Sequence, residues 1–166
     1  MKKTVLTYGL ISGVIAAVLM LAHVPFMDGG RKALILGYTG IVLSALLIFF
    51  GVRSYRENVG NGKISFGRGF AVGILIALIS AACYVAAWEA VYYSSPGIAD
   101  HVFDKQIEDL KEKGAPQAEI DAAAVQVESF KKLYANPFVN VAFTFIEPFP
   151  VGILMTLISA FILRRK

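Results

Sequence analysis

The sequence has little of what most enzymes and secreted domains rely on. Its single cysteine, Cys83, excludes a disulfide within the chain, and its place in an apolar stretch predicts a buried, unreactive thiol. Only 17% of the residues are charged, fewer than in an average soluble domain. There is no G-x-S-x-G motif, and Gly60-Asn61-Gly62 and Gly67-Arg68-Gly69 fit a turn and a helix entry rather than a phosphate-binding loop. The 166 residues leave no room for a separate catalytic domain.

Hydrophobic sequence is abundant instead, at 57% of the chain. A helix needs about 20 residues to cross the hydrocarbon layer of a membrane. The sequence therefore predicts an all-α membrane protein whose residues 1–166 form one transmembrane domain. The apolar stretches that supply its four helices are Val5–Val24, Ala33–Val52, Phe70–Tyr93 and Phe138–Leu163, which predicts helices at about 4–24, 33–53, 68–93 and 138–163.

The first stretch also has features of a signal peptide, because Lys2-Lys3 precedes a long apolar run. The segment Leu21-Ala22-His23-Val24-Pro25 is a poor cleavage site, since it lacks the usual small residues. We therefore favour an uncleaved first transmembrane helix. Pro25 and the glycine pair Gly29-Gly30 then predict a tight turn before the second helix.

Basic residues predict the orientation of the helices. Lysine and arginine accumulate on the cytoplasmic side of a membrane protein. The loop from Ser94 to Pro137, by contrast, holds five lysines and eight acidic residues. We therefore expect cytoplasmic N- and C-termini and an extracytoplasmic loop at 94–137, with no nucleic-acid partner despite a net charge of +4. The basic residues that flank the same helix ends are Lys2, Lys3, Arg53, Arg56, Lys63, Arg68, Arg164, Arg165 and Lys166.

The long loop predicts an amphipathic αα-hairpin at about 96–135. Apolar residues recur at roughly helical spacing on both sides of Gly114-Ala115-Pro116, which predicts two helices and a tight connection. Their apolar faces need cover from each other, the bundle, the membrane surface or a partner. A cap on the outer end of the bundle is the simpler interpretation, and a dedicated binding module is the alternative.

Glycines at a spacing of four predict close helix packing. Gly9 and Gly13 open the first helix, and Gly69 and Gly73 open the third. Small residues let helices approach closely in lipid, where hydrophobic burial no longer drives their association. The same stripes would also suit association between copies of the chain or with another membrane protein.

Three ionisable residues fall within or beside the apolar stretches: His23, Glu89 and Glu147. Charges in a bilayer are costly, so such residues are usually paired, protonated or exposed to water. Glu147 stands in Ile146-Glu147-Pro148-Phe149-Pro150, where two prolines lack backbone donors and break the helix. It is a candidate proton or cation site together with Glu89 and His23, and the alternative is a structural polar contact at a kink.

We expect no metal, no other cofactor and no catalytic residue. An imidazole and two carboxylates suit zinc or iron chemically. However, the sequence has neither the H-x-x-x-H nor the E-x-x-H spacing that places such ligands on one helix face.

Several short motifs carry a resemblance that extends over nearly the whole chain. The sequence resembles a bacterial family of small four-helix membrane proteins known as domain of unknown function 4199. The resemblance implies a location in the bacterial inner membrane, and it brings no known activity or ligand. The motifs are Tyr8-Gly9-Leu10, Gly51-Val52-Arg53-Ser54-Tyr55-Arg56, Gly62-Lys63-Ile64-Ser65-Phe66, Lys113-Gly114-Ala115-Pro116 with Glu119-Ile120, Gly152-Ile153-Leu154 and Leu163-Arg164-Arg165-Lys166.

These observations favour a non-enzymatic membrane protein, an accessory, scaffold or assembly component that contacts the lipid bilayer and either its own copies or a membrane complex. The alternative is a small transporter or channel-like module with Glu147 as its proton or cation site. A membrane enzyme that uses His23, Glu89 and Glu147 together is a third hypothesis. Whether these three side chains converge is the structural observation that separates the hypotheses.

Overall fold

The computed structural model describes residues 1–26 and 31–165, so positions 27–30 of the predicted first turn and Lys166 of the basic set lie outside the described residues. The described part confirms the predicted all-α fold with four candidate membrane spans and a helical hairpin between the third and fourth. The elements are α1 (Lys2–His23), η1 (Val24–Phe26), α2 (Arg31–Asn58), α3 (Phe66–Ser94), α4 (Ile98–Glu112), α5 (Gln117–Tyr134), α6 (Pro137–Ile146) and α7 (Phe149–Leu163).

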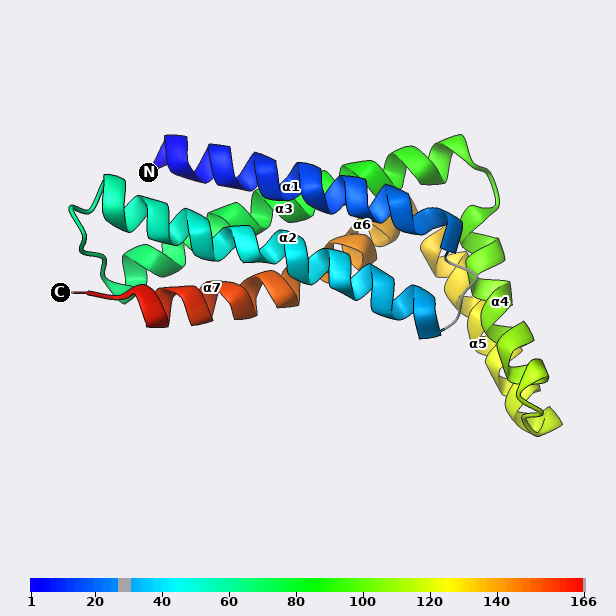
Figure 1. The fold of residues 1–166 in the computed structure, drawn as a ribbon. Coiled ribbons are helices and arrows are strands. Elements are labelled where there is room, and N and C mark those ends of the chain that lie inside the picture. Colours follow the sequence, from blue (N-terminus) through cyan, green and yellow to red (C-terminus); the bar gives the residue numbers. More distant parts are fainter. Residues whose placement is uncertain (27–30, 166) are drawn as a thin grey trace.

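The spans lie side by side with α3 at the centre, in contact with α1, α2, α6 and α7 (Figure 1). Both termini lie at one end of the bundle, which we call the terminal end. Helices α4 and α5 form the hairpin at the opposite end, the hairpin end, and project to one side (Figure 1). The second span extends to Asn58, beyond the predicted end at 53, because the polar segment Arg53–Asn58 continues the helix.

The core of the bundle is narrow, as expected for helices that turn apolar faces to lipid. Ile48 and Val52 of α2 pack with Val72 and Ile76 of α3, and each is at most 1% exposed. Many large apolar side chains on the outer faces stay exposed, which suits a lipid environment and not water.

The glycine stripes lie where helices touch within the chain. A Cβ atom on Gly13 would come within 2.6 Å of Cys83 Sγ, and one on Gly9 within 2.9 Å of Ile79 Cβ, so α1 packs directly on α3. On the other side of α3, Gly69 faces Ala160 and Gly73 faces Thr156 of α7. These faces are therefore occupied internally, and an oligomer would need another surface.

A buried serine links three spans at mid-bundle. Ser12 of α1 is fully buried and donates a hydrogen bond of 2.8 Å to the carbonyl oxygen of Ser44, which leaves its oxygen free to accept from the Ser80 hydroxyl at 3.0 Å. Such bonds add specificity between helices in a membrane.

The fourth span is not one continuous helix. It is divided into α6 and α7 at Glu147-Pro148, the position at which the sequence predicted a kink in a helix at 138–163. The division has a simple cause: Pro148 and Pro150 have no backbone N–H to donate to the preceding turn. Glu147 consequently sits at the joint between two half-helices.

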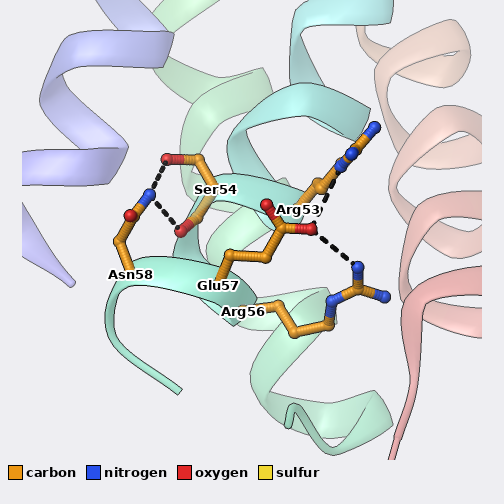
Figure 2. A network of polar contacts seen from close by, with 5 residues as sticks. All are labelled: Arg53, Ser54, Arg56, Glu57 and Asn58. Carbon is orange, nitrogen blue, oxygen red and sulfur yellow. Dashed lines mark hydrogen bonds and ion pairs between the residues drawn. The ribbon is translucent and has the colours of Figure 1, made fainter. Parts of the chain in front are cut away.

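Polar contacts close the terminal end of the bundle. Figure 2 shows Glu57 accepting from Arg53 Nε at 3.2 Å and from Arg56 Nη2 at 2.9 Å, while Asn58 donates to the carbonyl and hydroxyl oxygens of Ser54. An isolated antiparallel bridge then joins Ile64 to Arg165 through two backbone hydrogen bonds, so the segment after α7 is fixed to the connection between α2 and α3.

Candidate functional site: a cavity beneath the helical hairpin

A cavity of about 880 Å³ lies between the hairpin end of the bundle and the hairpin itself. This volume is in the range of pockets that hold small organic ligands, about 300–1,000 Å³. We call it the hairpin cavity, and residues from each of the helices α1 to α6 line it. Its lining residues are His23, Ala33, Leu34, Gly37, Tyr38, Tyr84, Trp88, Ala99, Val102, Phe103, Lys105, Gln106, Asp109, Lys113, Phe130, Tyr134, Phe143, Thr144 and Glu147.

The Glu147 carboxylate lines this cavity at the joint between α6 and α7. The hydroxyl of Tyr84, from α3, donates a hydrogen bond of 3.0 Å to Glu147 Oε2. No lysine or arginine forms an ion pair with Glu147 within the described part of the chain. The carboxylate therefore rests on a neutral partner and keeps accessible surface.

A second cluster of polar side chains, around Asn140 of α6, lies one to two helical turns before Glu147. The indole Nε1 of Trp88 donates to Asn140 Oδ1 at 3.2 Å, and the Thr144 hydroxyl donates to the same oxygen at 3.3 Å. The hydroxyl groups of Tyr134 and Thr144 are 3.4 Å apart, which connects the hairpin to α6. Asn140 is 1% exposed, yet its Nδ2 has no hydrogen-bond partner among the described residues.

His23 lies at the end of α1 against a notch in α2. The nearest imidazole atom would be 3.1 Å from a Cβ on Gly37, so the absence of a side chain there makes room for the ring. Within the described residues its Nε2 atom is buried and has no partner. His23 and Glu147 thus contribute to the same cavity.

Glu89 does not line the cavity. It is half-buried on α3, and its Oε1 atom is enclosed without a hydrogen-bond partner in the part of the chain that the structure describes. The structure therefore brings two of the three candidate ionisable residues together and leaves the third outside. No group of three or more His, Cys, Asp or Glu side chains suited to a metal occurs in residues 1–26 and 31–165.

Aromatic rings connect the hairpin to the bundle and form one wall of the cavity. The Phe103 and Phe130 rings meet edge to face at 5.2 Å between centroids, and Phe130 meets Phe143 of α6 in the same way at 5.1 Å. Tyr134 stacks on Phe130 at 5.8 Å. Such pairs contribute about 0.5–1.5 kcal/mol each beyond the area they bury, so this cluster is the main attachment of the hairpin.

Charged residues lie at the rim of the cavity, on the hairpin. Lys105 Nζ is 2.7 Å from Glu108 Oε2, and this carboxylate raises the pKa of Lys105. Elsewhere on the hairpin, outside the cavity lining, Lys131 of α5 pairs with Asp104 of α4 at 2.7 Å, which raises the pKa of Lys131 in the same way. Both lysines are therefore neutralised by neighbours on the hairpin.

Sequence reasoning missed several residues of this site, although a signal was present. Asn140, Thr144 and Glu147 follow one another at spacings of four and three, which places them on one face of an otherwise apolar segment. Tyr84 and Trp88 have the same relation on α3. Polar residues at helical spacing inside two apolar spans indicate an internal polar face.

The arrangement offers polar groups and apolar surface to a ligand. Its lining holds the carboxylates of Glu147 and Asp109, the imidazole of His23, several phenol, indole and hydroxyl groups, and broad apolar walls.

Comparison with known proteins gives one match. A family model described as a protein of unknown function, DUF4199, matches residues 7–165. No curated protein and no solved structure matches the chain.

Proposed function

This chain belongs to the DUF4199 family of proteins of unknown function, and we propose that it is a non-enzymatic accessory membrane protein that binds a small amphipathic molecule in the hairpin cavity. The observation that carries the proposal is the cavity itself, about 880 Å³ with polar groups at the α6–α7 joint, aromatic walls and a charged rim. A ligand with one polar end and one apolar part matches that gradient.

The proposed setting is the bacterial inner membrane, with the terminal end of the bundle in the cytoplasm and the hairpin outside. The support is the row of basic residues at the terminal end and the net acidic hairpin. In this orientation the cavity opens towards the outer surface, where it meets both the outer leaflet and the surrounding solution.

The proposal is tested by native mass spectrometry of protein extracted from membranes. Val102 of α4 lines the cavity, whereas Val125 of α5 does not and is 68% exposed. We expect a bound small molecule with the wild type and with Val125→Phe, and weaker binding with Val102→Phe, because the added ring takes up part of the cavity. Equal binding by Val102→Phe and Val125→Phe, or a ligand-free wild type, would contradict the proposal.

An assembly role is compatible with ligand binding and has its own support. Val125 and Leu133 leave apolar surface exposed on the hairpin, outside the four candidate spans. Cross-linking in intact membranes tests whether this surface meets a partner, and a strictly monomeric protein without neighbours would count against it.

A second candidate function is a proton or cation site at Glu147. It is favoured by the position of this carboxylate, at a break in a membrane span and on the same cavity as His23. Proton and cation flux into proteoliposomes would fall in Glu147→Gln if the site conducts. Unchanged flux in a folded Glu147→Gln protein would rule this function out. The enzyme hypothesis gains no comparable support, because Glu89 lies off the cavity.

A further inference from the structure

We propose that the ligand of the hairpin cavity is an organic cation with an apolar chain, and that its ammonium group binds at Glu147. This inference rests on the proposed binding function and specifies the chemistry of the ligand. It follows from the charge, the aromatic lining and the apolar walls of the cavity.

The charge at the α6–α7 joint favours a cation. Among the described residues, Glu147 is the one acidic residue of the bundle that lines the cavity, and the one lining carboxylate that lies in a candidate span. Its hydrogen bond from Tyr84 brings no positive charge, and His23 is the titratable side chain that interacts with it electrostatically. A carboxylate at membrane depth is costly without a positive partner. A bound ammonium would supply that partner.

The aromatic lining of the cavity also favours a cation. Tyr38, Tyr84, Trp88 and Tyr134 line the cavity together with Glu147. The faces of such rings carry negative potential and attract ammonium groups, most strongly where water is excluded. A cavity that is lined by aromatic rings and a carboxylate favours an ammonium over a phosphate or a carboxylate.

The apolar walls accommodate a chain. Leu34 of α2, Val102 and Phe103 of α4, and Phe130 of α5 line the cavity between the polar joint and the charged rim. A hydrocarbon chain that lies along them is removed from water while its head group stays at Glu147.

The charges of the hairpin favour a cation over an anion. Lys105 is paired with Glu108, and Asp109 lines the cavity together with Lys113. The loop that forms the hairpin carries eight acidic residues and five lysines, so the field at the entrance attracts cations and slows the approach of anions.

Trp88 makes the inference testable, because it is the only tryptophan of the chain and lines the cavity. Its fluorescence is followed in uncharged dodecyl maltoside micelles during titration with octyltrimethylammonium, octanol or octyl sulfate. We expect saturable binding in the order cation, neutral, anion. Glu147→Gln should weaken binding of the cation by about tenfold or more and leave octanol unchanged.

Two matched variants separate charge at the site from charge elsewhere and from misfolding. Glu89 follows Trp88 on α3 but lies outside the cavity, so Glu89→Gln removes a nearby carboxylate and leaves the lining unchanged. This variant should bind the cation as the wild type does. Tyr38 is 51% exposed, so its replacement leaves the core intact. Tyr38→Leu should weaken cation binding several-fold, and Tyr38→Phe, which keeps the ring face, should not.

The outcomes distinguish the inference from the proposed function. If none of the three probes changes Trp88 fluorescence, the binding function itself fails. If octanol and octyl sulfate bind as tightly as the cation, or if Glu147→Gln weakens all three equally, the cavity binds amphiphiles and the cation inference is overturned. If lysophosphatidylethanolamine displaces octyltrimethylammonium, the natural ligand is a lipid with an ammonium head group. If octyltrimethylammonium binds and is not displaced, the natural ligand is a free organic cation. Both results support the inference.

Discussion

The hydroxyl of Tyr84 lies 3.0 Å from Glu147 Oε2 and donates a hydrogen bond to it. This bond joins the middle of the third span to the break in the fourth, two elements that are far apart in the sequence. It holds the carboxylate at the cavity wall, and it satisfies one oxygen of a group that would otherwise face apolar surroundings. The pair is therefore both a structural contact and the polar end of the candidate site.

Removal of the phenol hydroxyl should have a measurable cost. Tyr84→Phe leaves the ring in place and deprives Glu147 of its donor, so we expect a loss of about 1 kcal/mol in the free energy of unfolding. Unfolding in detergent measures it. Tyr38→Phe is the control, because Tyr38 lines the same cavity but is half exposed. Equal stability of both variants would show that the Tyr84 bond contributes nothing.

The contact between α1 and α3 should not tolerate even a methyl group at Gly13. A Cβ atom there would lie 2.6 Å from Sγ and 2.7 Å from Cβ of Cys83, so Gly13→Ala must push the helices apart, at a cost of about 1–3 kcal/mol. Gly67→Ala is the matched control, because nothing lies within 4 Å of its new methyl group. Thermal unfolding compares the two variants.

A compensating exchange tests the cause of that loss. Cys83→Gly removes both clashing atoms, so the double variant Gly13→Ala with Cys83→Gly should recover part of the stability lost by Gly13→Ala. A double variant less stable than either single one would place the strain elsewhere.

The buried serine of α1 should contribute more to the free energy of unfolding than an exposed hydroxyl of α2. Ser12→Ala removes both interhelical hydrogen bonds of this side chain and should cost about 1 kcal/mol. Thr39→Ala removes one bond to the carbonyl of Ile35 within its own helix at an exposed position, and should be nearly neutral. Denaturant unfolding in mixed micelles gives both values, and reversal of this order would contradict the assignment.

The hairpin should depend on its aromatic cluster more than on its ion pair. Phe103→Ala removes the edge-to-face contacts with Phe130 and Tyr134, and should destabilise the hairpin by about 2–4 kcal/mol. Asp104→Asn breaks only the exposed pair with Lys131 and should have a smaller effect. Hydrogen exchange of α4 and α5 measures both. Faster exchange in Asp104→Asn than in Phe103→Ala would make the ion pair the main attachment.

Labelling of single cysteines tests the proposed orientation. In a Cys83→Ala background, Ser129→Cys on the hairpin should react with an impermeant maleimide added to intact cells. Lys63→Cys at the terminal end should react only after the membrane is opened. The opposite pattern would invert the topology.

The spans and the hairpin were predictable because each depends on composition and spacing within one segment. About 20 apolar residues make a span whatever surrounds them, and Gly114 with Pro116 ends one amphipathic helix and begins the next. The joint in the fourth span was predicted as a kink, and Glu147 and Pro148 keep right-handed helical backbone angles there. Two prolines indicate missing donors, but the packing of α6 on α3 and α5 decides how far the halves separate.

The candidate site was only partly predictable, since it is assembled from six helices. Sequence reasoning singled out Glu147 and His23 because charge inside an apolar stretch is conspicuous in any single segment. It grouped Glu89 with them behind Glu147, because depth along a helix does not tell which way a side chain faces. Tyr84 and Asn140 acquire their roles only from partners on other helices, a relation that no single segment contains.

The joint at Glu147-Pro148 also has a mechanical consequence. Helix α6 has 10 residues and packs on α5 of the hairpin and on α3, whereas α7 packs on α2 and α3. Helix α6 is therefore the element that links the hairpin to the joint, and Glu147 lies where α6 ends. A ligand or partner that changes how the hairpin packs would reach this carboxylate through ten residues of helix, without any need to repack α7.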